Sequence, residues 1–320
     1  MIRIFFYFML LSLTMTVSTQ AQNLKLDPER MVFTAVQGTT TMPQTLVIYN
    51  YFPQDIKIAQ IRISGKDDAA FNLTQPPPPV IEQGTSVETK ISFAPASDQK
   101  GPLKAVIEIS LKDQKQIWKV DLHGLSTIGL EGKNEPPLSD VLEVLGYKID
   151  PGWEELGNHT EPELQGEEVN ASLFQASGSE MVEMIPVARF SPDFKLPFGY
   201  YTPQGDRMPK LHQVGELAAA GDRPEHQITY PALSSGTVKF DPVTEIFGIF
   251  TYSPTHIAFS EDHLNQKFHP DHATHATRIY PLRDQDGIRI ENAFLVCFEE
   301  AKNGDYQDYV FVLKNVELAK

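Results

Sequence analysis

The chain has 320 residues and a formal net charge of −15; residues 1–127 carry +1 and residues 128–320 carry −16. This length indicates about two domains. The acidic second half argues against nucleic acid and anionic membrane surfaces as partners. With Cys297 as the only cysteine, no internal disulfide can form, so both domains must be stabilised by packing alone.

The first residues have the pattern of a secretory signal peptide. Arg3 precedes an apolar stretch at 4–13, and small residues at 17–21 offer a cleavage site, so residues 1–22 are expected to be removed. About a dozen residues are continuously apolar, whereas a membrane-spanning helix needs ~20. We therefore expect a secreted protein, in the extracellular space, at the cell surface or in the periplasm, with no membrane span after cleavage. The missing disulfide favours a bacterial origin, and nothing in the sequence indicates the oligomeric state.

Residues 23–126 alternate between short apolar runs and turn residues. About seven such runs occur in some hundred residues, and the run Val87–Phe93 alternates cleanly between apolar and polar positions. This pattern predicts a β-sandwich. No candidate catalytic residue stands out, and every residue here is expected to serve the core or a turn.

The same segment resembles the immunoglobulin-like ASH/HYDIN-type domain, which is related to the major-sperm-protein fold. The resemblance rests on Phe93-Ala94-Pro95 after the turn at Gly84, and on the closing Leu122-His123-Gly124. It implies an extracellular spacer that presents a neighbouring module.

Residues 127–168 are expected to form a linker with one short helix. Gly129, Gly132 and Pro136 suit an extended connection, and Leu138 to Leu145 has apolar residues at helical spacing. The acidic, turn-rich part from Pro151 to Glu168 is expected to be poorly ordered, with Trp153 as an apolar anchor.

Residues 169–320 are expected to form a second all-β domain, a jelly-roll-like sandwich. Residues 171–176 are taken as a short helix. Five aromatic residues lie in a proline-containing, loop-like stretch, where they either pack in the core or stack on sugars: Phe190, Phe194, Phe198, Tyr200 and Tyr201.

Two apolar runs close the chain, 294–298 and 309–316, and the connection between them is acidic. Each run is apolar on both faces, as in a strand buried on both sides. Calcium binds six to eight oxygen ligands, and this connection offers several at short range. The sequence leaves two alternatives, a calcium site or a solvated hairpin turn. The candidate ligands are Glu299, Glu300, Asp305 and Asp308.

This end of the chain also resembles a bacterial extracellular β-domain family of unknown function. Its hallmark is an acidic pair followed by a glycine and D-Y-N-D-h-V-F, matched here by Glu299-Glu300 and by residues 304–311, with Gln307 in place of the Asn. The family is suspected of binding calcium in adhesin-like or matrix-associated proteins. By this resemblance the foremost ligands are Glu300, Asp305 and Asp308.

Three further clusters contain residues of the types that bind metal ions. Glu261 and Asp262 follow an apolar run and either join the calcium site or open a short helical turn. The three histidines in HPDHATH (269–275) suggest zinc, but Pro270 argues against the helix that would place them on one face. Residues 284–287 (DQDG) fit a hairpin turn.

The sequence therefore predicts a secreted, non-enzymatic binding or adhesion protein, stabilised by calcium, with a surface glycan or an extracellular protein as partner. Two alternatives stay open. One is a polysaccharide-acting hydrolase, which needs two opposed carboxylates. The other is a purely structural envelope or matrix protein.

Overall fold

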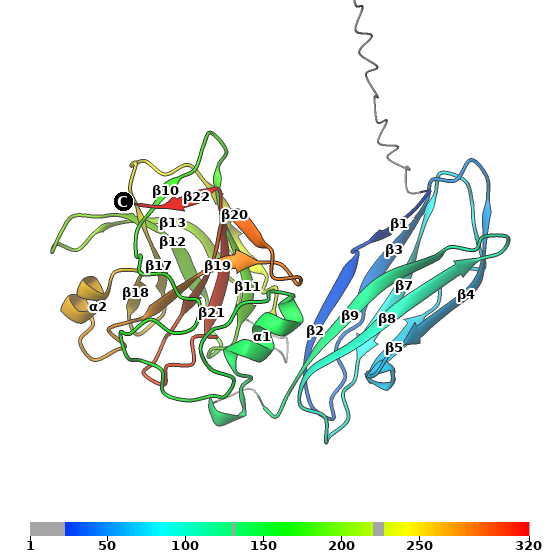
Figure 1. The fold of residues 1–320 in the computed structure, drawn as a ribbon, viewed down its shortest axis with the longest axis horizontal. Helices are drawn as coiled ribbons and strands as arrows, with labels where there is room; N and C mark the ends of the chain where they lie inside the picture. Colours follow the sequence, from blue (N-terminus) through cyan, green and yellow to red (C-terminus); the bar gives the residue numbers. More distant parts are fainter. Residues whose placement is uncertain (1–22, 130–131, 220–226, 320) are drawn as a thin grey trace, which may run out of the picture.

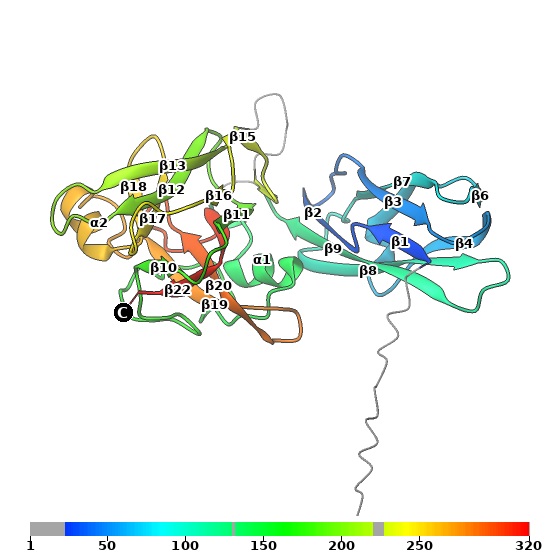
Figure 2. The ribbon, with the colours of Figure 1, turned by 90° about the horizontal axis from the view of Figure 1, so that it is seen from above.

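The computed structural model describes residues 23–129, 132–219 and 227–319; the expected signal peptide lies outside these residues. Two β-sandwiches lie side by side with a helix between them (Figures 1 and 2). The all-β prediction is thus confirmed. No helix in the described ranges is long and apolar enough to cross a membrane.

The first sandwich consists of two sheets with the strand orders β1-β3-β7-β5 and β2-β9-β8-β4-β6. A single 3₁₀ turn, Asp68–Ala70, precedes β5. β2 pairs with β9 in parallel, and the other pairs are antiparallel. The strands are β1 (Leu24–Asp27), β2 (Arg30–Val36), β3 (Gln44–Asn50), β4 (Ile56–Ser64), β5 (Phe71–Gln75), β6 (Val80–Ile81), β7 (Ser86–Phe93), β8 (Gly101–Leu111) and β9 (Ile117–Thr127).

The two motifs behind the ASH/HYDIN resemblance meet in this core. Phe93 is fully buried and packs against the tilted rings of Phe71 and Phe33, whose centroids lie 5.0 Å and 6.2 Å away. A Cβ atom on Gly124 would lie 2.3 Å from the Phe93 ring. The glycine of the closing motif is therefore required by the close approach of the β9 backbone to this phenylalanine.

The second sandwich has one sheet with the order β14-β11-β21-β20-β19, to which β16 adds beside β11, and a second with the order β15-β13-β12-β17-β18. β10 pairs separately with β22. The strands are β10 (Phe174–Ala176), β11 (Val182–Arg189), β12 (Leu196–Thr202), β13 (Lys210–Leu217), β14 (Ile228–Thr229), β15 (Leu233–Gly236), β16 (Lys239–Phe240), β17 (Gly248–Tyr252), β18 (Ile257–Phe259), β19 (Thr277–Arg283), β20 (Arg289–Phe298), β21 (Tyr309–Lys314) and β22 (Val316–Leu318).

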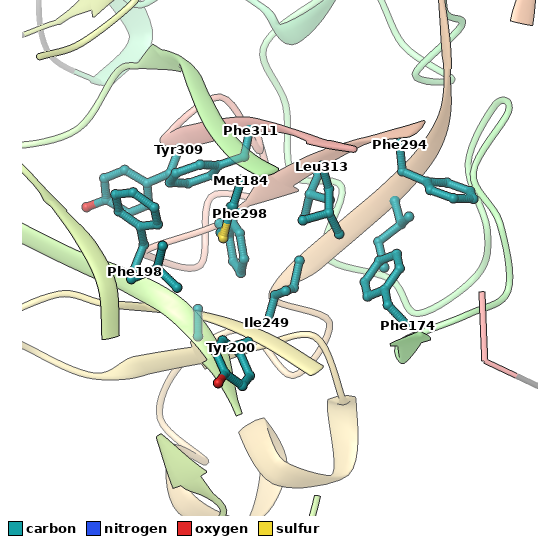
Figure 3. Close-up of a cluster of buried hydrophobic side chains, with 14 of the residues drawn as sticks. Phe174, Met184, Phe198, Tyr200, Ile249, Phe294, Phe298, Tyr309, Phe311 and Leu313 are labelled. Atoms are coloured by element: carbon teal, nitrogen blue, oxygen red, sulfur yellow. The ribbon is translucent and has the colours of Figure 1, made fainter. Parts of the chain in front are cut away.

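Aromatic side chains fill the space between these two sheets (Figure 3). Phe311 on β21 lies 5.0 Å from Phe198 and 5.9 Å from Phe298, measured between ring centroids. Phe198, Tyr200 and Tyr201 are buried on β12, and Phe190 is buried as well. Residues 196–202 of the stretch interpreted as loop-like thus form a central strand, whereas residues 190–195 are irregular as expected. The core alternative is correct for these four aromatics.

Two sequence expectations differ from this fold. Residues 171–176 contain the strand β10 rather than a helix, because Phe174 enters the core and pairs with Leu318. The proline-containing stretch expected to be loop-like includes Pro197, which lies within β12. This proline is tolerated because β12 pairs with β17 only from Phe198 onward, so Pro197 faces a single partner strand.

The helix α1 (Leu138–Leu145) confirms the predicted amphipathic segment. Its five apolar residues are buried against the outer face of the β20-β21 sheet and against Val32 and Leu125 of the first sandwich. Each contributes about 1.5–3 kcal/mol of burial free energy. Arg30 donates hydrogen bonds to the carbonyls of Val144 and Leu145 at the end of the helix. α1 therefore joins the two sandwiches through an apolar cluster outside their cores.

The segment from Pro151 to Glu168 is a covering layer and not the poorly ordered stretch expected from its composition. Trp153 is buried as predicted and packs on the same sheet face as α1. Arg278 on β19 donates to the carbonyls of His159, Glu161 and Glu163. These bonds organise an otherwise irregular acidic segment, because one guanidinium provides five donors in a fixed geometry.

Candidate metal centre

The acidic loop connects β20 to β21, whose last paired residues are Phe298 and Tyr309. Two residues of the loop have left-handed backbone conformations, Gly304 with φ 65° and Tyr306 with φ 56°. For a tyrosine this conformation is costly, so the surroundings must hold it. The Tyr306 ring is buried and its hydroxyl donates to the His275 carbonyl at 2.5 Å.

Three carboxylates come together inside this turn. One ligand oxygen each from Glu299, Asp305 and Asp308 lies within 4.8 Å of the other two. Their side chains are almost inaccessible, with exposed fractions of 0%, 2% and 6%. Buried carboxylates at such distances can all be ionised only with a cation beside them; without one they share protons.

Part of the required compensation comes from the loop's own backbone. Glu299 accepts hydrogen bonds from the N–H groups of Ala301 (2.8 Å) and Asp305 (2.9 Å). Asp308 accepts from the N–H of Glu300 at 2.5 Å. The carboxylates therefore shape the turn as well as gathering negative charge.

The hydrogen bonds do not offset burial. Burial and the neighbouring Asp305 charge raise the pKa of Glu299 to about 7. Burial also raises the pKa of Asp305. Burial, together with the charges of Glu299 and Asp305, raises the pKa of Asp308 well above its usual range. Burial thus favours protonation of the group, and a bound cation would displace the protons.

Two oxygen acceptors in the same loop have no hydrogen-bond partner. They are Oδ1 of Asp305 and Oε1 of Gln307, and both side chains are buried. Unsatisfied buried acceptors are rare and costly. The candidate metal ligands are therefore carboxylate and amide oxygens only. Hard divalent cations such as calcium prefer such ligands.

Glu300, foremost among the predicted ligands, does not belong to this group of three. Its side chain accepts a hydrogen bond from the Tyr309 hydroxyl at 2.7 Å. Its neighbour Glu299 takes the inner place instead. The sequence shows the acidic pair, but which member turns inward depends on how the loop folds back.

The structure also separates Glu261 and Asp262 from this group. Glu261 stands at the N-cap position of α2 (Asp262–Phe268), and its carboxylate accepts from the Tyr201 hydroxyl at 2.9 Å. Asp262 contacts His275 Nδ1 at 2.9 Å. The helical-turn interpretation of this segment is thus the one that the structure supports.

The histidines of HPDHATH divide between two places. His269 and His272 lie beside His256, whereas His275 contacts Glu168. The His256 and His272 rings are stacked 3.8 Å apart at an angle of 11°. A metal ion lies in the plane of a ligating imidazole, so two nearly parallel stacked rings cannot share one. This arrangement gives no support to zinc.

An ionic network that the sequence did not reveal lies beneath the loop. His275 Nε2 contacts Glu168 Oε1 at 2.9 Å, and Arg278 pairs with the other oxygen of Glu168. Burial lowers the pKa of His275, but hydrogen bonds to Asp262 and Glu168 and their charges outweigh it and raise the pKa to about 9. The one signal in the sequence is Arg278 inside an apolar strand, which implies a buried partner.

These two clusters do not have the geometry of a hydrolase. The loop carboxylates are buried on one turn and do not face each other across a cleft. Both nitrogens of His275 are taken by carboxylates, so the ring is not a free base for a nucleophile.

A cleft of about 1150 Å³ lies at the junction of the sandwiches. β8 and β9 form one wall, with Lys104 and His123, and α1 with the following residues forms another, with Glu143 and Tyr147. Lys104 and Glu143 form an ion pair of 2.8 Å within it. Clefts of this size at domain interfaces are common sites for ligands.

Comparison with known proteins gives little beyond the architecture itself. No family model matches the chain, and no curated protein does. Among solved structures it is similar to a protein of unknown function from Porphyromonas gingivalis W83 (17% identity, 32% of this chain and 46% of that one, TM-score 0.27). It is also similar to the ASH/PapD-like domain 7 of human CEP192 (18% identity, 33% and 87%, TM-score 0.26) and to the YadV chaperone (11% identity, 74% and 99%, TM-score 0.27). The chain spans less than half of the first of these, and at such TM-scores we draw no function from them.

Proposed function

We propose that this chain is an exported, non-enzymatic binding protein whose second sandwich is stabilised by a calcium ion held by Glu299, Asp305 and Asp308. The observation that carries the proposal is the convergence of these three buried carboxylates within 4.8 Å. The unpartnered oxygens of Asp305 and Gln307 are further candidate ligands. The first sandwich serves as a spacer, in keeping with its resemblance and its uncharged core.

The physical argument is one of charge compensation. A divalent cation neutralises most of the charge that burial makes costly, and it is bound by oxygen atoms alone. Because the ligands must lose protons, calcium affinity should rise as the pH increases through about 7, the pKa of Glu299. A purely solvated turn would show no such dependence.

The binding role is inferred from the leader-like residues and the junction cleft. The leader-like residues 1–22 favour export, and the three gathered carboxylates of the loop are too buried to reach a substrate. The junction cleft carries charges of both signs and hydrogen-bonding groups suited to an extracellular glycan or protein. An array of surface glycans, probed with and without calcium, tests this part. Absence of any bound glycan would favour a structural role in the envelope or matrix.

Thermal unfolding with calcium and with a chelator tests the metal. Calcium at a hundred times its dissociation constant should stabilise the fold by about 2.7 kcal/mol and raise the midpoint. Asp305→Asn and Asp308→Asn should abolish the rise. The matched control is Asp286→Asn, which changes an exposed carboxylate in the turn between β19 and β20. An unchanged midpoint for the unaltered protein would remove calcium from the proposal.

A further inference from the structure

Gln307 connects the acidic loop to the junction of the two sandwiches. Its side chain is fully buried, and its amide nitrogen donates to Glu135 Oε2 at 2.8 Å. Glu135 is 172 positions away in the sequence, at the end of the turn that follows the first sandwich. An asparagine side chain is one methylene shorter than that of Gln307, so this contact depends on the longer residue.

Glu135 is itself a meeting point at the junction. Its Oε1 accepts from the backbone N–H of Gly132 at 3.0 Å and from the side-chain amide of Gln227 at 3.3 Å. Gln227 precedes β14, whose Thr229 contacts Thr34 of the first sandwich, with 3.3 Å between the two hydroxyls. These hydrogen bonds, joined by the backbone between Gln227 and Thr229, thus connect the acidic loop to β2.

Gln307 is itself a residue of the loop that gathers the carboxylates. The residue lies between Asp305 and Asp308, and its Oε1 is buried without a hydrogen-bond partner. Burial raises the pKa of Asp305, whereas the nearby Gln307 amide acts in the opposite direction. The amide donates to Glu135 and also influences Asp305, so a cation that engages Asp305 changes the surroundings of the amide.

We propose that Gln307 and Glu135 are positioning residues that couple cation binding in the acidic loop to the ordering of the junction between the sandwiches. The inference rests on the proposed calcium site. A cation that takes the free oxygens of Asp305 and Gln307 fixes the amide with its N–H₂ group toward Glu135. Coupling of this kind is reciprocal, so ordering of the junction strengthens cation binding by the same factor.

Amide hydrogen exchange of the full-length protein, with and without calcium, measures the coupling at residues 132–145 and 227–234. Calorimetry on the same samples measures the calcium affinity. In the unaltered protein, calcium should slow exchange in both segments by about tenfold. In Gln307→Asn, which keeps an amide oxygen for the cation, calcium should still bind within about tenfold of the original affinity, and the slowing should disappear.

The outcomes distinguish failure of the calcium site from failure of the coupling. Calcium binding without slower exchange in the unaltered protein would overturn the coupling and leave the calcium site intact. No calcium binding would overturn both. Equal slowing in Gln307→Asn would show that Gln307 is not the connection. Should that variant fail to fold, Glu135→Gln replaces it, since it keeps the shape of the side chain and removes one acceptor for the Gln307 amide.

Discussion

The two sandwiches are stabilised in different ways. Among the described residues of the first, every buried polar side chain is uncharged, for example Asn50 and Thr89. The second buries charged groups in pairs and clusters, among them Arg189, Arg278 and Glu299. Hydrophobic burial depends little on pH or ions, whereas buried charges depend on both. The second sandwich should therefore be the one that responds to its surroundings.

The largest contrast is expected from Arg278→Met. The change leaves Glu168 buried without its guanidinium and releases the carbonyls of the covering layer, and breaking a buried pair in this way costs about 3–5 kcal/mol. Guanidinium unfolding followed by tryptophan fluorescence measures the loss, because Trp153 lies 5.5 Å from the Arg278 guanidinium. Ile107→Val in the first core, expected to cost about 0.5–1.5 kcal/mol, is the comparison. A loss below 1 kcal/mol for Arg278→Met would contradict the difference between the sandwiches.

A pH series separates the sandwiches further. The pKa of His275 is raised to about 9, so its stabilising effect is complete below pH 6.5 and is lost as the pH rises through 9. The whole effect is about 3 kcal/mol at most. Burial lowers the pKa of His123 in the first sandwich to about 4, so its effect is complete above pH 6.5 and disappears in acid.

The free energy of unfolding should therefore fall between pH 6.5 and 9.5, and His275→Gln should flatten that interval. An alkaline loss that persists in His275→Gln would assign it to other groups.

Gly146→Ala tests the helix that both sandwiches share. Gly146 ends α1 with φ 76°, and an added Cβ would lie 1.9 Å from the Arg30 guanidinium, which binds the end of the helix. We expect a loss of about 1–2 kcal/mol. Gly132→Ala is the control, because Gly132 has a similar φ of 56° but no atom within 4 Å of the added Cβ. Equal losses for both would show that the Arg30 contact contributes nothing.

The smallest effect is expected on the surface of the first sandwich. Glu108 contacts Arg62 Nη2 at 2.5 Å and Lys119 at 3.4 Å, but both cationic side chains are more than half exposed. Exposed ion pairs contribute little because water and salt screen them. Glu108→Gln should leave the thermal midpoint unchanged at 0.15 M salt. A clear shift would mean that the first sandwich also depends on charge.

Local patterns were sufficient for most of the architecture. Alternation over Val87–Phe93 and the helical spacing of Val141, Leu142 and Leu145 correspond to β7 and α1. The acidic loop was found because its residues are neighbours in the sequence. Contacts between distant residues were not predictable: Glu168 lies 107 positions from His275, and Glu135 lies 172 from Gln307. The choice of Glu299 over Glu300 depends on backbone N–H groups that converge only once the loop has closed.

Cys297 lies in the apolar cluster that contains α1, and its reactivity can report when that cluster opens. Its thiol is fully buried on β20, beneath the face that α1 covers, and burial raises its pKa well above the usual range. Only the thiolate reacts quickly with alkylating reagents, so the native thiol is protected twice. Its labelling rate therefore reports how often the layer of α1, Trp153 and Tyr306 over this sheet face opens. Alkylation of this native thiol therefore measures local opening without an engineered probe.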